Sequence, residues 1–139
     1  MYPPELVAPM KQELTGNGFR ELLTAEDVEQ LLESKEGTTF VVFNSVCGCA
    51  ARNARPGAVA AVKSADKLPD NLVTVFAGVD AQAVAKARSY TFPYPPSSPS
   101  MGLFKDGKLV HIIERHQIEG RPAQVIAQHL ISVFDEHCN

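Results

Sequence analysis

The stretch TTFVVFNSVCGCA, from Thr38 to Ala50, indicates how the rest of the chain is organised. Its first eight residues are rich in β-branched and aromatic side chains, which predicts a short buried strand. Small apolar residues over positions 49–64 favour a helix, with a kink at Pro56. Cys47 and Cys49 therefore lie where the strand ends and the helix begins. In open α/β sheets, functional sites gather at this carboxyl end of a strand.

The other elements alternate between helices and strands. Thr24 is expected to N-cap a helix that Gly37 ends, and Asp80 to cap another helix. Asp106-Gly107 is a strong signal for a two-residue hairpin turn. The expected helices cover residues 5–14, 24–34, 81–90 and 120–137, the last with Pro122 in its first turn. A second strand is expected over 71–78, a proline-rich loop over 91–100 and a hairpin over 100–115.

This order of elements predicts an α/β fold. Strand–helix–strand units followed by a hairpin and a closing helix indicate a mixed sheet of about four strands with helices on both faces. The first crossover should be right-handed. An N-terminal helical extension precedes the sheet, and the length predicts a single domain over residues 1–139.

Composition excludes several classes of protein. The chain has 139 residues, 45% of them hydrophobic and 21% charged, with a net charge of −3. This balance does not suggest a nucleic-acid binder. No apolar run approaches the roughly 18 residues of a membrane span, and the first residues lack the apolar core of a signal peptide. We therefore expect a cytoplasmic protein, in which three cysteines favour redox or metal chemistry over a structural disulfide.

The position of Cys47 and Cys49 suggests thiol chemistry. A helix N-terminus offers unpaired N–H groups and a positive dipole end, which lower the pKa of a thiol and favour the nucleophilic thiolate. We predict that Cys47 is the exposed attacking thiol and that Cys49 is the resolving thiol. Gly48 supplies the backbone freedom that a bond between the two requires. Such a bond should be strained and easily reduced.

Structural and metal-binding alternatives apply to the same pair. Two nearby cysteines can be small buried apolar residues, although Cys-Gly-Cys at a strand end is poor core material. A zinc site would need two further ligands, and the remaining candidates form no second ligand pair. We assign no metal ligand. The remaining candidates for a zinc ligand are Cys138, His111, His116, His129 and His137. Near the end of the chain, Cys138 is expected to be frayed, or else to be a third redox thiol.

Two arginines follow the cysteines. Arg52 and Arg55 can each hold a thiolate or a substrate carboxylate through charge-assisted hydrogen bonds, or can lie on a solvated helix face. For Arg55 the solvated face is favoured. Tyr94 either lines a substrate groove or packs against its neighbours, and we give His111 and His116 no catalytic role.

Two sets of motifs resemble those of known proteins. SPSMGLFKDGK resembles the segment of the thioredoxin superfamily in which a cis-proline precedes a strand and its hairpin, with Pro99 at the proline position. The resemblance implies that the backbone of Ser98 and Pro99 pairs with a bound peptide or thiol. NSVCGCA, LVTVFAG, YPPSSPS, KDGK and ERHQIEG together resemble the bacilliredoxin family over essentially the whole chain.

The bacilliredoxin resemblance implies a thioredoxin-like fold and a Cys-Gly-Cys active site. It implies removal of bacillithiol, a small bacterial thiol, from protein mixed disulfides, with bacillithiol as co-substrate and no cofactor. Arg52 would hold the carboxylates of the bacillithiol malate group. Val46 replaces the usual thioredoxin tryptophan and Val41 the usual buried acid, which argues against efficient general disulfide reduction.

Two other functions are compatible with the same residues. A disulfide isomerase or weak oxidant would need a readily formed Cys47–Cys49 bond and would act on scrambled protein disulfides. A non-catalytic metal-binding or redox-sensing module would carry stoichiometric zinc that is lost on mutation of either cysteine.

Overall fold

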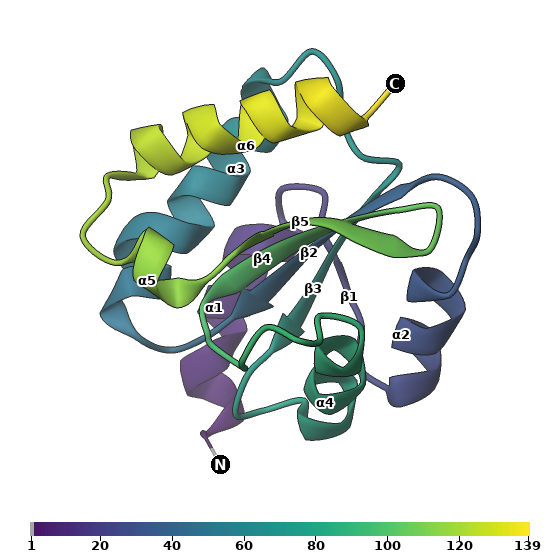
Figure 1. Cartoon of the computed structure of the whole chain (residues 1–139). Coiled ribbons are helices and arrows are strands. Elements are labelled where there is room, and N and C mark those ends of the chain that lie inside the picture. Colours follow the sequence, from purple (N-terminus) through teal and green to yellow (C-terminus); the bar gives the residue numbers. More distant parts are fainter. Residues whose placement is uncertain (1) are drawn as a thin grey trace.

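The chain, in a computed structural model that describes residues 2–139, forms a mixed five-stranded sheet between helices (Figure 1). The strand order is β1-β3-β2-β4-β5. The strands are β1 (Arg20–Glu21), β2 (Thr38–Asn44), β3 (Asn71–Phe76), β4 (Ser100–Lys105) and β5 (Lys108–Ile113). The helices are α1 (Pro4–Thr15), α2 (Ala25–Leu32), a π-helical turn η1 (Ala50–Ala54), α3 (Arg55–Ser64), α4 (Ala81–Ser89), α5 (Arg115–Ile118) and α6 (Ala123–His137).

Strand β2 is the centre of the sheet. It pairs in parallel with β3 and antiparallel with β4, so that Val41 lies opposite Val73 on one side and Gly102 on the other. All seven of its residues are buried. Successive side chains point to opposite faces of a strand. Phe40 and Val42 accordingly join one hydrophobic cluster, while the residues between and after them join the other.

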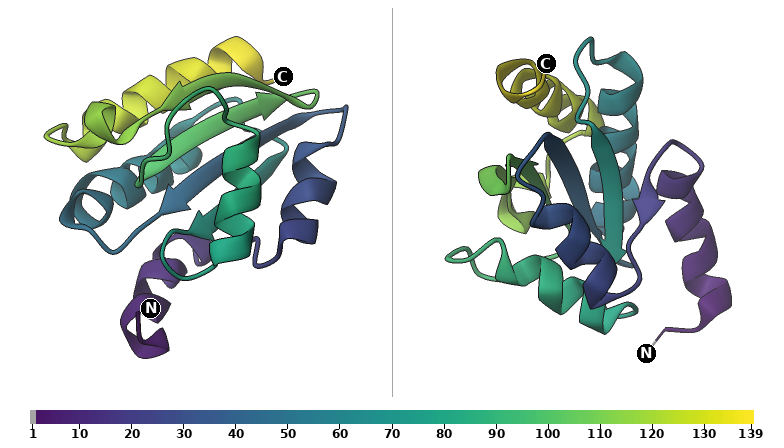
Figure 2. Two further views of the ribbon diagram at one scale, coloured as in Figure 1. Left: turned by 60° about the horizontal axis from the view of Figure 1, so that its bottom comes forward. Right: turned by 90° about the vertical axis from the view of Figure 1, so that its right-hand side faces the viewer.

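Two layers of helices cover the sheet (Figure 2). Helices α3 and α6 pack on the face of Phe40, and α2 and α4 pack on the face of Val41. The close approach of α3 and α6 depends on Gly57, because a Cβ there would lie only 2.7 Å from Ile126 Cγ2. Helix α1 packs beside β1 and α3.

The predicted central strand, second strand, hairpin and four main helices are confirmed. Asp106 and Gly107 have φ angles of 52° and 84°, the left-handed values that a two-residue hairpin turn requires. Thr24 caps α2, its Oγ1 accepting the Asp27 N–H at 3.1 Å. The two-residue β1 and the four-residue α5 were not predicted, since neither is long enough to show periodicity. With β1 the sheet has five strands where about four were expected.

Three local predictions were wrong. Helix α2 ends at Leu32, and Gly37 instead begins the approach to β2, donating its N–H to Asp106 Oδ1 at 3.0 Å. Asp80 occupies the N-cap position of α4 but makes no capping hydrogen bond, because its carboxylate pairs with Lys11 at 3.3 Å. Pro122 is the N-cap residue of α6 and lies outside its first turn.

A kink was predicted at Pro56, but the helix after the cysteines contains a π-helical turn just before this proline. A proline cannot donate to the carbonyl four residues before it and its ring crowds that carbonyl. The chain widens into the π-helical turn η1 just before Pro56, and the Arg55 N–H donates to the Ala50 carbonyl five residues back. Single π-helical turns of this kind are rare and are frequently found at functional sites.

Candidate active site

The arrows of the parallel strands β2 and β3 point to the same end of the sheet (Figure 1). The two cysteines follow the end of β2. Cys47 follows β2 by three residues, and the helix that leads into α3 starts directly after it. A hollow of about 230 Å³ opens beside Cys47. Its walls also include Gly78 after β3, Ser98 before β4 and Arg115 at the start of α5. Four segments that are distant in sequence therefore meet around one thiol.

The environment of Cys47 favours its thiolate. The Ser45 hydroxyl lies 3.2 Å from Cys47 Sγ, and the Cys49 Sγ lies 2.7 Å from it. Partial burial raises the pKa of the Cys47 thiol, but hydrogen bonds from Cys49, Ser45 and the backbone N–H groups of Ala50 and Cys49 outweigh it. The net result is a pKa below the usual value for cysteine. These N–H groups are the helix N-terminal donors that the sequence predicted.

Cys49 has the opposite pKa shift. Burial, the hydrogen bond to Cys47 and the negative charge of the Cys47 thiolate raise the pKa of Cys49, while Arg115 partly opposes this change. Both cysteines are free and half-buried. The prediction that Cys47 is the exposed thiol of the pair was therefore wrong, and its hydrogen bonds distinguish it from Cys49 instead. The arrangement places a thiol next to a thiolate in one reactive pair.

Gly48 and Arg52 lie against each other beside the pair. A Cβ at position 48 would be only 2.9 Å from an Arg52 terminal nitrogen, so the exposed guanidinium passes over the glycine. Arg52 therefore lies beside the residue between the two cysteines, although it does not line the hollow next to Cys47.

The cis peptide predicted between Ser98 and Pro99 is present. A second one, between Phe92 and Pro93 in the proline-rich loop, was not predicted. Ser98 and Cys47 line the same hollow. The cis-proline segment therefore lies beside Cys47, as the resemblance to the thioredoxin superfamily implied. The Ser98 carbonyl accepts a hydrogen bond from the Arg115 guanidinium at 3.1 Å.

Arg55 is buried, which corrects the expectation of a solvated helix face. Its side chain is 3% exposed and lies between α1 and the end of β2. Nε donates to Glu13 at 2.8 Å, and one terminal nitrogen donates to Asn44 Oδ1 at 2.9 Å and the Ser45 carbonyl at 2.8 Å. Arg55 therefore holds the segment that leads to Cys47, at a distance from the thiol itself.

Ser45 and Arg115 are site residues that the sequence did not indicate. Ser45 stands two residues before Cys47. Because serines are common in loops, its presence there did not indicate a role at the site. Arg115 belongs to ERHQIEG, a segment that carried the resemblance without a chemical role. Its place at the hollow depends on α5, an element too short to predict.

Cys138 is not frayed. Its side chain is 4% exposed and belongs to the hydrophobic cluster under α6, and burial raises the pKa of its thiol despite a hydrogen bond with Thr38. Thr38 begins β2, whereas Cys47 lies beyond its other end. Cys138 is therefore separated from the reactive pair by the length of the strand.

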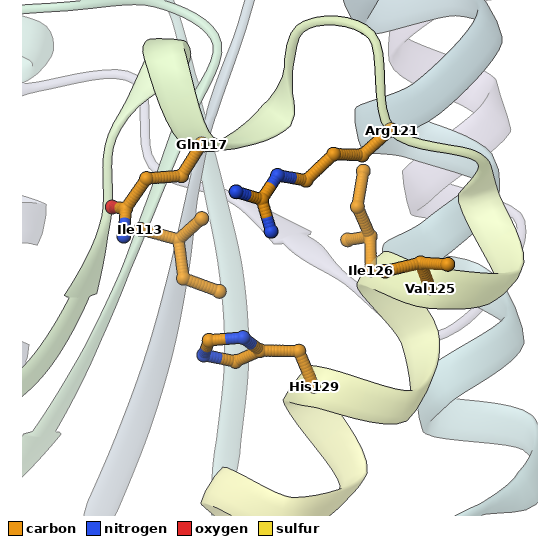
Figure 3. A pocket seen from close by; sticks show the side chains of 6 residues that line it. All are labelled: Ile113, Gln117, Arg121, Val125, Ile126 and His129. Atoms are coloured by element: carbon orange, nitrogen blue, oxygen red, sulfur yellow. The ribbon is translucent and has the colours of Figure 1, made fainter.

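Two of the histidines, on β5 and α6, lie together. His111 and His129 face each other, with 2.9 Å between their Nε2 atoms. His129 also borders a small cavity of about 20 Å³ between α5 and α6, shown in Figure 3.

Among residues 2–139, the structure gathers no three histidine, cysteine or acidic side chains arranged to hold a metal ion. Within the same residues, none of the helices is long and apolar enough to cross a membrane.

Solved structures with the same architecture are thioredoxins. A thioredoxin mutant from Halobacterium salinarum superposes with a TM-score of 0.60 at 14% identity, covering 88% of this chain and 93% of that one. The thioredoxin of Fasciola hepatica gives a TM-score of 0.55 at 22% identity, over 86% and 99% of the two chains. The fold is therefore the thioredoxin fold, with a Cys-x-Cys pair at the end of its central strand.

Comparison with known sequences gives the family. A family model described as disulphide isomerase matches residues 2–138. A bacilliredoxin of Cytophaga hutchinsonii is 60% identical over 136 residues, covering 98% of this chain and 99% of that protein. A bacilliredoxin of Halalkalibacterium halodurans is 56% identical over 137 residues, covering 99% and 94%. The chain belongs to the bacilliredoxin family.

Proposed function

We propose that the protein removes bacillithiol from mixed disulfides on client proteins. Cys47 is the nucleophile and Cys49 the resolving thiol. Bacillithiol is a co-substrate, and the reaction uses no cofactor or metal. The protein works in the cytoplasm, where a reducing environment keeps both thiols available for exchange.

One observation carries the proposal. Two thiols lie 2.7 Å apart at a helix N-terminus, and the pKa of the first is lowered while that of the second is raised. Exchange requires a thiolate that attacks and a second thiol that acts only after the first has formed a disulfide. The raised pKa of Cys49 depends partly on the Cys47 charge, and it should fall once Cys47 is in a disulfide and that charge has gone.

The first step is an exchange between Cys47 and the client's disulfide. The Cys47 thiolate attacks the bacillithiol sulfur, so that a new S–S bond forms on Cys47 Sγ. The client–bacillithiol bond breaks, and the client cysteine leaves as a thiolate that takes up a proton. The hydrogen bonds from Ser45 and the backbone of Ala50 hold the attacking sulfur in place.

The second step regenerates the enzyme. Cys49 attacks Cys47 Sγ, bacillithiol leaves as a thiolate, and a Cys47–Cys49 disulfide forms, which two further thiols reduce. Alternatively, a second bacillithiol attacks the bacillithiol sulfur on Cys47 and leaves as bacillithiol disulfide. The second route needs no resolving cysteine.

Four further residues bind the substrate in this proposal. Gly48 leaves room for the Arg52 guanidinium beside the pair, and Arg52 holds a carboxylate of the bacillithiol malate group. The backbone of Ser98 and Pro99 meets the bound thiol or client at the edge of the hollow. Replacing Arg52 with Ala should weaken activity on bacillithiol disulfides and spare activity on small neutral disulfides. Equal loss on both would contradict this role.

A single-turnover experiment tests the function. The Cys49→Ala variant is mixed with a client protein that carries bacillithiol on one cysteine, and the intact masses of both proteins are followed. We expect bacillithiol to move onto Cys47 and the client to become a free thiol. If no bacillithiol moves, while the wild type rearranges ordinary protein disulfides, the isomerase function replaces this one. The closeness of the two thiols makes that second function chemically possible.

A further inference from the structure

Arg115 lies at the reactive pair without a role in the steps above. It begins α5 and lines the hollow together with Cys47 and Ser98. Its positive charge acts on both cysteines, lowering the pKa of Cys49. With 44% of its side chain exposed, it can be reached by a ligand from solution.

The guanidinium is held in place from two sides. Nε donates to Glu119 Oε1 at 2.5 Å, and one terminal nitrogen donates to the Ser98 carbonyl at 3.1 Å. The backbone N–H of Arg115 donates to Ser97 Oγ at 3.3 Å, which fixes the start of α5 against the cis-proline loop. A guanidinium has five N–H donors, and these two side-chain contacts use two of them. Three donors therefore remain for a ligand or for water.

The occupied Ser98 carbonyl changes what the hollow offers. Because Arg115 donates to this carbonyl, a bound group near Ser98 meets a cation beside the carbonyl oxygen. A fixed guanidinium is well suited to a carboxylate, which it can bind through two parallel hydrogen bonds. The chemistry of the hollow therefore favours an anionic small thiol over a neutral one.

We propose that Arg115 binds a carboxylate of the small thiol carried by the mixed disulfide and seats that thiol in the hollow beside Cys47. The inference rests on the proposed function and adds a specificity residue to it. Arg52 approaches the pair from η1 and Arg115 from α5, so two arginines from different elements serve a ligand with two carboxylates. Glu119 is the positioning residue that holds Arg115.

The test compares three thiols on one client. The Cys49→Ala protein is the parent, so that the reaction stops after the first transfer. The client carries bacillithiol, 2-mercaptoethanol or cysteamine as its mixed disulfide, which present a dicarboxylate, a neutral group and a cation. Transfer rates are measured by intact mass for the parent and for Arg115→Met, Arg115→Lys and Arg121→Met. Arg121 is the matched control, since it lines the separate cavity in Figure 3.

We expect Arg115→Met to lower the bacillithiol rate relative to the 2-mercaptoethanol rate by about tenfold, the loss of one charge-assisted hydrogen bond. Arg115→Lys should restore part of this preference, cysteamine should gain relative to bacillithiol, and Arg121→Met should behave as the parent. If the parent prefers bacillithiol and Arg115→Met keeps that preference, the inference fails alone. If the parent transfers bacillithiol but does not prefer it over 2-mercaptoethanol, the inference again fails alone. If the parent transfers no bacillithiol at all, the proposed function fails and this inference fails with it.

Discussion

Cysteines lie near both ends of β2, and their pKa values are shifted in opposite directions. At the carboxyl end, Cys47 is half-buried and its pKa is lowered. At the other end, Cys138 packs under α6 against Thr38, and burial raises its pKa. Burial raises the pKa of each thiol, so burial alone does not account for the difference.

The difference comes from the hydrogen-bond donors at each end. Beyond the carboxyl end of β2 the chain turns into a helix, and the first N–H groups of that helix point toward its N-terminal end. Two of them, with the Ser45 hydroxyl and the Cys49 thiol, point to Cys47 Sγ. Cys138 has the single Thr38 hydroxyl. The hydrogen bonds that Cys47 receives, first from Cys49 and Ser45 and then from the helix N-terminus, therefore account for its lowered pKa.

The largest expected effect separates the two ends directly. Cys47→Ser should reduce bacillithiol transfer by at least about a thousandfold, because a serine hydroxyl is hardly ionised near neutral pH. Cys138→Ser should leave the transfer rate unchanged but lower the free energy of unfolding by about 1–3 kcal/mol, since it places a hydroxyl in the core. Single-turnover rates and urea unfolding measure the two quantities. A large loss of rate in Cys138→Ser would show that the two ends are coupled.

The next effect concerns the support of the reactive end. Arg55→Ala should lower the free energy of unfolding by about 2–4 kcal/mol, because it leaves Asn44 Oδ1 and the Ser45 carbonyl without their buried partner. Glu13 contributes less, since its side chain is 36% exposed and water can replace the ion pair. The matched control is Arg52→Ala, an exposed arginine three residues earlier that should change stability by less than about 0.5 kcal/mol. Equal losses in urea unfolding would contradict the structural role of Arg55.

The sequence was sufficient for the parts of the molecule that depend on local pattern. The eight residues before Val46 predicted the central strand, and the position of Cys47 after it predicted the helix N-terminus and its lowered pKa. Arg55 could not be placed, because one of its partners, Glu13, lies 42 residues away on another helix. Arg115 could not be placed either, because its position depends on packing of the four-residue α5 against the cis-proline loop. Long-range contacts of single side chains leave no periodic signal in a sequence.

A smaller effect tests the donors at the reactive end. Ser45→Ala removes one of the hydrogen bonds that lower the pKa of Cys47, so this pKa should rise. Alkylation of Cys47 by iodoacetamide at pH 7 should slow by about three- to tenfold, as expected for one hydrogen bond to a charged group at a half-buried site. Peptide mass mapping measures Cys47 alone, and Ser132→Ala on the exposed face of α6 is the control. An unchanged rate would assign the lowered pKa to the backbone and Cys49.

The smallest effect separates two dependences on pH. Burial, then the charges of His129 and His137, lower the pKa of His111 below its usual 6.5, with Glu136 opposing them. The unfolded chain therefore binds a proton on this ring more readily than the folded protein does. The contribution of His111 to the free energy of unfolding is present above pH 6.5, and it is lost as the pH falls through the pKa that His111 has in the folded protein.

His111→Asn removes that group. The free energy of unfolding should then fall less between pH 7.5 and pH 5.5, a range of about 2 pH units that spans the titration of histidine. The difference from the wild type should be less than about 1 kcal/mol, because the ring is partly exposed. Urea unfolding at several pH values measures the slope. The dependence of Cys47 alkylation on pH should be the same in both proteins, because His111 contacts α6 on the far side from the hollow's thiol. A variant that altered both profiles would mean that proton binding between β5 and α6 reaches the reactive end of β2.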